Sequence, residues 1–156
     1  MRYASFWLLA ASIVLPSAAT AQSVPALSAG QVRFFVSFLE RVGSADVDPA
    51  LLSHNEAGVS TIFSLNASEA AALHLAAMSY RKQMTAIRQT ENALIAGKSG
   101  LSSADLATIA QLVQTRNGFV AAIAASFLAS LRAEVLTRVL SDAQQTIDFR
   151  NAKGIN

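Results

Sequence analysis

A four-residue break between two long helical patterns constrains the fold of this chain more than any other feature. The break is Gly97-Lys98-Ser99-Gly100, and glycine commonly ends helices. Helically spaced positions that are largely apolar run from Leu73 to Leu94 before it, and from Leu106 to Leu131 after it. Two long helices joined by so short a turn must lie antiparallel. The sequence therefore predicts a long antiparallel helical hairpin.

Capping boxes mark the starts of both hairpin helices. Asn66 with Glu69, and Ser102 with Asp105, are pairs in which each side chain satisfies a free backbone N–H at a helix start. We expect the first of these helices to end near Ala96. The positions expected to face the core are Leu73, Ala77, Tyr80, Met84, Ile87, Glu91 and Leu94 in the first helix, and Leu106, Ile109, Val113, Val120, Ala124, Phe127 and Leu131 in the second.

The second hairpin helix contains an unusual apolar stretch. No charge occurs between Arg116 and Arg132, but a bilayer span requires roughly 18 or more apolar residues in a row. We interpret this stretch as a buried helix and expect no membrane span in the mature protein. Gly118 lies within it, where glycine costs up to about 1 kcal/mol relative to alanine. We therefore expect a bend or a close helix crossing at Asn117-Gly118.

Three shorter helical segments are expected around the hairpin. A capping box at Ser28 and Gln31 predicts a helix from Ala29 to Val42, ended by Gly43 and with Val32, Phe35, Phe38, Leu39 and Val42 facing inward. Asp48-Pro49 predicts a short helix through Leu52, and residues 59–63 fit either a helix or a brief strand, of which we favour the helix. Ser141 with Gln144 predicts a break near Leu140 and a short last helix carrying Ile147 and Phe149.

The composition agrees with an all-α fold and one domain. Pro25 and Pro49 are the only prolines after residue 21, and cysteine is absent, which excludes disulfides and thiol chemistry. We expect one helical domain over residues 22–150 and a frayed tail over residues 151–156. The formal net charge of +2 falls to +1 without Arg2, so we expect no nucleic-acid partner.

The first 21 residues have the pattern of a signal peptide. Arg2 supplies a positive start, residues 6–15 are almost continuously apolar, and Ala19-Thr20-Ala21 precedes Gln22 as an exporting peptidase requires. The sequence predicts cleavage between Ala21 and Gln22 and a periplasmic or secreted protein. Whether the signal is cut or kept as an anchor is left open by the sequence.

Two short segments resemble a known family. Leu65-Asn66-Ala67-Ser68-Glu69 and Leu140-Ser141-Asp142-Ala143-Gln144 are similar to the LTxxQ motif that occurs twice in the Spy/CpxP-like periplasmic proteins, where the copies bracket a helical hairpin. Asn66, Glu69 and Ser141 depart from the motif's letters. The resemblance implies an ATP-independent chaperone or envelope-stress component, often a cradle-shaped dimer that holds unfolded clients.

A client-holding surface would combine positive charge with apolar side chains. Arg81, Lys82 and Arg88 are the densest basic group, and Tyr80 and Met84 lie close to them on the same predicted helix. These five residues are the candidate surface for clients or a partner. The alternative is an ordinary solvated face on which Arg88 pairs with Glu91.

No catalytic or metal site is recognisable in the sequence. Gly97-Lys98-Ser99 follows a helix and lacks the first glycine of a phosphate-binding loop. His54 and His74 have no nucleophile and carboxylate in a triad pattern, and His74 with Met78 makes a poor metal site. We expect no enzyme activity and no cofactor. Besides the chaperone, the alternatives are an envelope adaptor that docks on one partner or on itself as a homodimer, and a metal-responsive sensor.

Overall fold

Five helices make up the computed structural model, which describes residues 26–44 and 46–155. They are α1 (Ala29–Gly43), α2 (Pro49–Phe63), α3 (Ala67–Ile95), α4 (Ser103–Ala129) and α5 (Ala133–Ala152). The described residues contain no strand, so the predicted all-α class is confirmed. The predicted signal peptide and its cleavage site at Ala21 and Gln22 lie outside the described residues.

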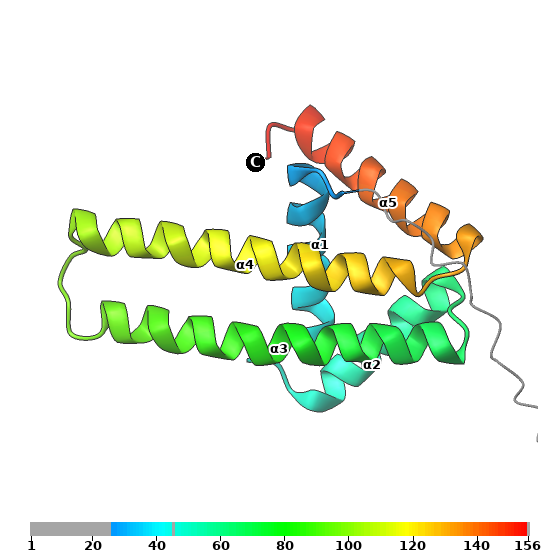
Figure 1. The fold of residues 1–156 in the computed structure, drawn as a ribbon, viewed down its shortest axis with the longest axis horizontal. Helices are drawn as coiled ribbons and strands as arrows, with labels where there is room; N and C mark the ends of the chain where they lie inside the picture. The colour runs from blue at the N-terminus through cyan, green and yellow to red at the C-terminus, as the bar shows by residue number, and fades with distance from the viewer. Residues whose placement is uncertain (1–25, 45, 156) are drawn as a thin grey trace, which may run out of the picture.

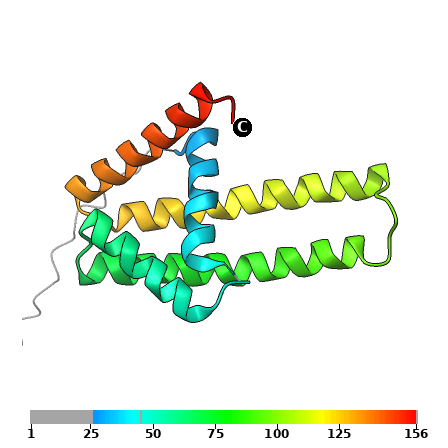
Figure 2. The same cartoon turned by 180° about the vertical axis from the view of Figure 1, so that it is seen from behind.

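The helices form two layers (Figures 1 and 2). α3 and α4 lie side by side and antiparallel, which confirms the predicted hairpin. α1 crosses both of them on one side and contacts every other helix, while α2 packs beside α3 and α5 packs on α1 and α2. The half of the hairpin that ends in the turn at Gly97 extends beyond this second layer. α1 is therefore the central element that joins the two layers.

The core lies where α1 crosses the hairpin. Phe35 and Leu39 of α1 and Leu73 and Tyr80 of α3 are all fully buried, and the ring of Phe38 stacks on that of Phe127 with centroids 6.0 Å apart. The predicted inward stripes are confirmed at this crossing. The α2 segments predicted on either side of residue 55 are one continuous helix.

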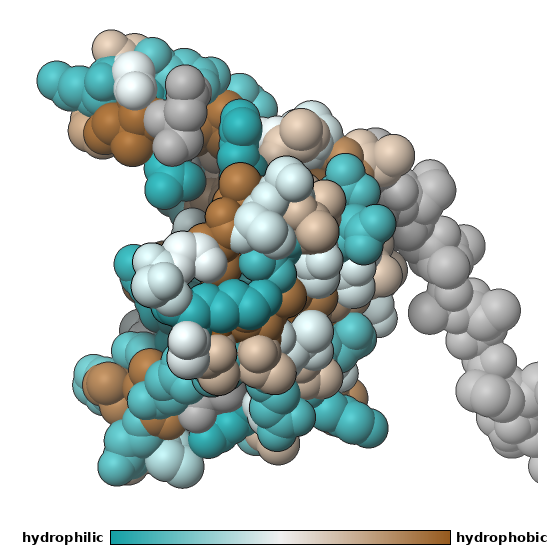
Figure 3. All heavy atoms as spheres, turned by 90° about the vertical axis from the view of Figure 1, so that its left-hand side faces the viewer, coloured by the Kyte–Doolittle hydropathy of each residue, from teal (hydrophilic) through white to brown (hydrophobic). Residues whose placement is uncertain are grey.

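Two of the predicted core positions in α4 are wrong. Leu106 is 56% exposed and Val113 is 36% exposed. Both lie in the half of α4 that extends beyond α1, so no second layer covers them. Seen from the turn end, the hairpin shows hydrophobic residues interspersed with hydrophilic ones (Figure 3), and Ile95 and Leu101 are also exposed there.

The close helix crossing occurs at Gly43 and not at Gly118, where we expected one. Gly118 lies in an unbroken part of α4, and a Cβ added there would meet no atom within 4 Å. A Cβ at Gly43 would lie 2.5 Å from the backbone oxygen of Ala77 in α3. The backbone of Gly43 is not in the left-handed conformation that a glycine helix cap adopts. The role of Gly43 is therefore to let α1 approach α3 closely.

The break predicted near Leu140 is also wrong. α4 ends at Ala129, and α5 runs without interruption through Ser141 to Ala152. Inside α5 the Gln144 side chain donates to Asp148 and does not reach back to Ser141. The chain turns earlier, between Ala129 and Ala133, where the Glu69 side chain of α3 accepts a hydrogen bond from the backbone at the start of α5. Where we expected fraying, the Ile155 N–H donates to the Arg150 carbonyl and closes the helix.

Candidate functional site

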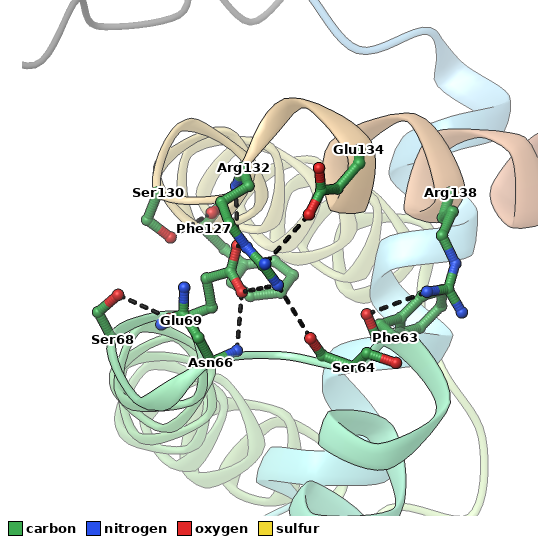
Figure 4. Close-up of polar contacts among 10 residues, drawn as sticks. All are labelled: Phe63, Ser64, Asn66, Ser68, Glu69, Phe127, Ser130, Arg132, Glu134 and Arg138. Carbon is green, nitrogen blue, oxygen red and sulfur yellow. Dashed lines mark hydrogen bonds and ion pairs between the residues drawn. The ribbon is translucent and has the colours of Figure 1, made fainter.

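Glu69 joins two corners of the fold that are far apart in sequence (Figure 4). Its carboxylate is 1% exposed and accepts a hydrogen bond from the backbone N–H of Asn66 at 2.8 Å, at the start of α3. It also accepts from the Arg132 backbone N–H at 2.8 Å and from Arg132 Nε at 3.1 Å, at the start of α5. One carboxylate therefore caps two helices.

Two arginines at the start of α5, the N-cap Arg132 and Arg138, satisfy carbonyls at the C-terminal end of α2. Arg132 Nη2 donates to the Ser64 carbonyl at 3.0 Å, and Arg138 Nη2 donates to the Ile62 carbonyl at 2.7 Å. Ser64 ends α2 in the left-handed conformation, with φ of 54°. Positive groups at a helix C-terminus also interact favourably with the helix dipole. We call Glu69, Arg132, Arg138 and Ser64 the corner latch (Figure 4).

The latch carboxylate is held in its ionised form. Burial alone would raise the pKa of Glu69, but hydrogen bonds from Arg132 and Asn66 outweigh burial and keep the pKa below its ordinary value. All of its donors come from the protein itself. A carboxylate so placed is unsuited to general acid or base catalysis, because it has no free lone pair directed at a substrate. The corner latch is a structural device.

A second polar cluster connects α1 to α3. The Tyr80 hydroxyl donates to Glu40, Arg88 Nη2 donates to Glu40 at 2.7 Å, and Arg88 also pairs with Asp46. Burial raises the pKa of Tyr80, and the hydrogen bond and negative charge of Glu40 raise it further. Tyr80 therefore remains a neutral phenol at physiological pH and offers no nucleophile.

These placements correct the predicted client surface. Tyr80 is fully buried and Met84 is 6% exposed, because both lie on the face of α3 that packs in the core. Arg88 pairs with Glu40 and Asp46 and not with Glu91. Arg81 is half-buried, and Lys82 is the one exposed member of the set. The five residues do not form one surface.

The two motif-like segments also differ from each other in the structure. Asn66 and Glu69 form the capping box that begins α3, directly after Leu65. Leu140, Ser141 and Gln144 lie in the middle of α5 and cap nothing. Only the first segment therefore has the local role that the pattern predicts.

Neither histidine belongs to a cluster of reactive groups. His54 is exposed, and His74 Nδ1 lies 3.0 Å from Glu56 Oε2 with its side chain 58% exposed. Met78 is 51% exposed near His74. Within residues 26–44 and 46–155, no group of three histidines or carboxylates is close enough to hold a metal ion.

A groove between α3 and α4 is the feature that sequence reasoning missed. It has a volume of about 480 Å³, and no residue of α1, α2 or α5 lines it. We call its lining the outer hairpin face, and it consists of Ala72, Leu75, Ala76, Ser79, Gln83, Ala122, Ile123, Ser126, Phe127 and Ser130. Most of these residues are small, and none is charged. Leu75, on the rim, is 67% exposed.

α4 presents little charge to solvent. Its two charged residues are Asp105, which is 9% exposed, and Arg116, which is half-buried. By length and composition α4 is apolar enough to cross a membrane, and 22% of the residues in its 18-residue apolar segment are buried. The expectation of a buried helix holds for one side of α4 only. The other side is exposed to solvent and carries few charged groups.

Comparison of the chain with protein-family models, curated proteins and solved structures found no match. The outer hairpin face, supported by the corner latch, is therefore identified from its geometry alone.

Acidification should destabilise the fold through two carboxylates. A hydrogen bond from Lys98, with others from Ser102, lowers the pKa of Asp105 from 3.8 to about 2, and the pKa of Glu69 lies below 4.5. A carboxyl group whose pKa is lower in the folded state than in the unfolded state stabilises the fold at pH values above its unfolded-state pKa. This stabilisation is lost as the pH falls through the folded-state pKa. We expect a constant melting temperature above about pH 5 and a decline between about pH 5 and pH 2. Thermal melts followed by circular dichroism test this, and D105N should decline less steeply.

Proposed function

We propose that this chain is an exported, non-catalytic helical protein of the cell envelope that associates with a second copy of itself through the outer hairpin face. The observation that carries the proposal is the low exposed charge of α4, a helix of 27 residues whose two charged residues are the buried Asp105 and the half-buried Arg116. A helix face that remains in water normally carries charged residues. A bare neutral face is characteristic of a surface that becomes buried in an assembly.

A second copy suits this face better than a charged partner does. In a two-fold interface the same patch meets itself, so a neutral patch avoids like-charge repulsion. The groove is lined by small residues, and the exposed Leu75 side chain at its rim supplies an apolar group for the groove of the other copy. The outer hairpin face covers residues 72–83 and 122–130 and is about 18 Å long, so an interface of the standard size of about 800 Å² per copy would continue along the hairpin beyond it.

A membrane is a poorer occupant of the same face. The outward positions of α4 include Gln111, Gln114, Thr115 and Ser126, whose polar groups would lose their water in a lipid core. The larger apolar residues Val120 and Leu128 of α4 are fully buried. Leu106 and Val113 are exposed, but the polar positions interrupt the apolar outer side of α4, so a neighbouring protein surface fits better than lipid.

The client-holding hypothesis has less support than it had from the sequence. Of its basic and apolar candidates, Tyr80 and Met84 are buried and Arg88 is paired. Arg81 and Lys82 remain, and Met78, which is 51% exposed, is the one exposed large apolar residue that lines a hollow with Arg81 among the described residues. A delay in aggregation of a denatured client by the purified protein, without nucleotide, would restore the chaperone as the better proposal.

Light scattering coupled to gel filtration tests the self-association. The wild-type protein should have twice the monomer mass at tens of micromolar, and A122D should shift the mass to the monomer because it places an unpaired charge in the interface. A57D is the matched control, since Ala57 is exposed on α2 away from the outer hairpin face. A monomeric wild-type protein would contradict self-association, and crosslinking in cells would then show whether a different single partner is captured.

A further inference from the structure

A second groove lies in the other layer of the molecule, between α1, α2 and α5. It has a volume of about 420 Å³, within the range of small-ligand sites. Its apolar wall consists of Phe34 and Phe38 of α1, with rings stacked 6.1 Å apart, and Val59, Ile62 and Phe63 of α2. We call it the α5 groove. It shares no residue with the outer hairpin face, so it is independent of the proposed function.

One end of the α5 groove is positively charged. Arg150 lines the groove and also lines, with Arg33, an adjoining hollow of about 20 Å³. That hollow is large enough for about one oxygen-sized group. Neither arginine has an ion-pair partner within the described residues. Two guanidinium groups without carboxylate partners among the described residues, beside one small hollow, form a binding point for an anion.

The rest of the groove carries little opposing charge. Arg41 lies two helical turns after Phe34 on the same side of α1 and lines the groove further along. Among the described residues, Asp142 of α5 is the one carboxylate that lines it. With Arg41, Arg150 and Asp142 together the lining is net positive, so an acidic ligand is favoured over a neutral or basic one.

We propose that the α5 groove binds a single-chain fatty carboxylate. The hydrocarbon chain lies against Phe34, Phe38 and Phe63, where it leaves water. The carboxylate lies at the charged end, where Arg150 and Arg33 donate hydrogen bonds to its oxygens. The apolar wall and the charged end select together for an amphiphile with an acidic head group.

Calorimetric titration with dodecanoate and with 1-dodecanol, both below their aggregation concentrations, tests the proposal. The purified protein should bind dodecanoate saturably and bind the alcohol at least about tenfold more weakly, since the alcohol has no charge for the arginines. R150Q should weaken dodecanoate binding about tenfold, and D142N should strengthen it. R81Q is the matched control and should leave the affinity unchanged, because Arg81 does not line the groove.

Three outcomes would overturn the proposal. They are the absence of saturable dodecanoate binding, equal affinity for acid and alcohol, and an R150Q variant that binds as the wild type does. The Arg150 side chain makes no hydrogen bond within the described residues, so R150Q should fold normally. Its circular dichroism spectrum and melting temperature verify this before the titration.

Discussion

Replacing Glu69 with glutamine should lower the free energy of unfolding by about 3 kcal/mol and the melting temperature by about 10 °C. The neutral amide has one acceptor oxygen where the carboxylate has two, so it cannot serve Asn66 and Arg132 at once. Its NH₂ group would also face donors and not acceptors. Chemical denaturation of E69Q and the wild type, followed by circular dichroism at 222 nm, measures the difference.

The matched control for E69Q is E134Q. Glu134 also pairs with Arg132, at 3.0 Å, but its side chain is 72% exposed. Exposed ion pairs contribute between about 0 and 1 kcal/mol, so E134Q should change stability little. If E69Q were as stable as E134Q, the corner latch would not hold the two corners together. R132A should cost nearly as much as E69Q, and the double variant should cost less than the sum.

Replacing Gly43 with alanine should destabilise the protein by about 2 to 3 kcal/mol. The added methyl group would lie 2.5 Å from the Ala77 backbone oxygen, and a backbone atom in the middle of α3 cannot rotate away as a side chain would. α1 must therefore shift away from α3, which loosens the packing of Phe35 and Leu39. The melting temperature of G43A, measured by calorimetry, gives the cost.

G118A is the control for this second prediction, with the opposite sign. Gly118 is exposed in the interior of α4 and has open space around it. Alanine there should stabilise the helix by up to about 1 kcal/mol, because it restricts the unfolded chain and favours helix. A G43A variant as stable as the wild type, or a destabilised G118A, would mean that the helix crossing is not where the structure has it.

Local signals predicted most of the helix starts in this fold. The capping boxes at Ser28, Asn66 and Ser102 each begin a helix as expected. The similar letters at Ser141 do not, because the chain is already helical there. The true start of α5, at Arg132, has no side-chain cap of its own and depends on Glu69 instead. A cap supplied from 63 residues away leaves no local pattern to read.

The same limit applies to the surfaces. Periodicity correctly placed Tyr80 on the apolar side of α3, yet charge clustering suggested that it borders an exposed basic patch. Periodicity also placed Leu106 and Val113 in the core, although both are exposed. The spacing of apolar residues shows which side of a helix is apolar but not whether another helix covers that side. The neutral outer side of α4 is visible in the sequence as the run without charge after Arg116, once the position of α1 is known.

The most direct test of the outer hairpin face uses the absence of native cysteines, so that an introduced cysteine is the only thiol in the chain. The rate of maleimide labelling is measured for A122C, on the outer hairpin face, and for A57C, which is exposed on α2. At high protein concentration A122C should label more slowly than A57C, and dilution below the dissociation constant should bring the two rates together. Equal rates at every concentration would contradict the proposal that this face is buried between two copies.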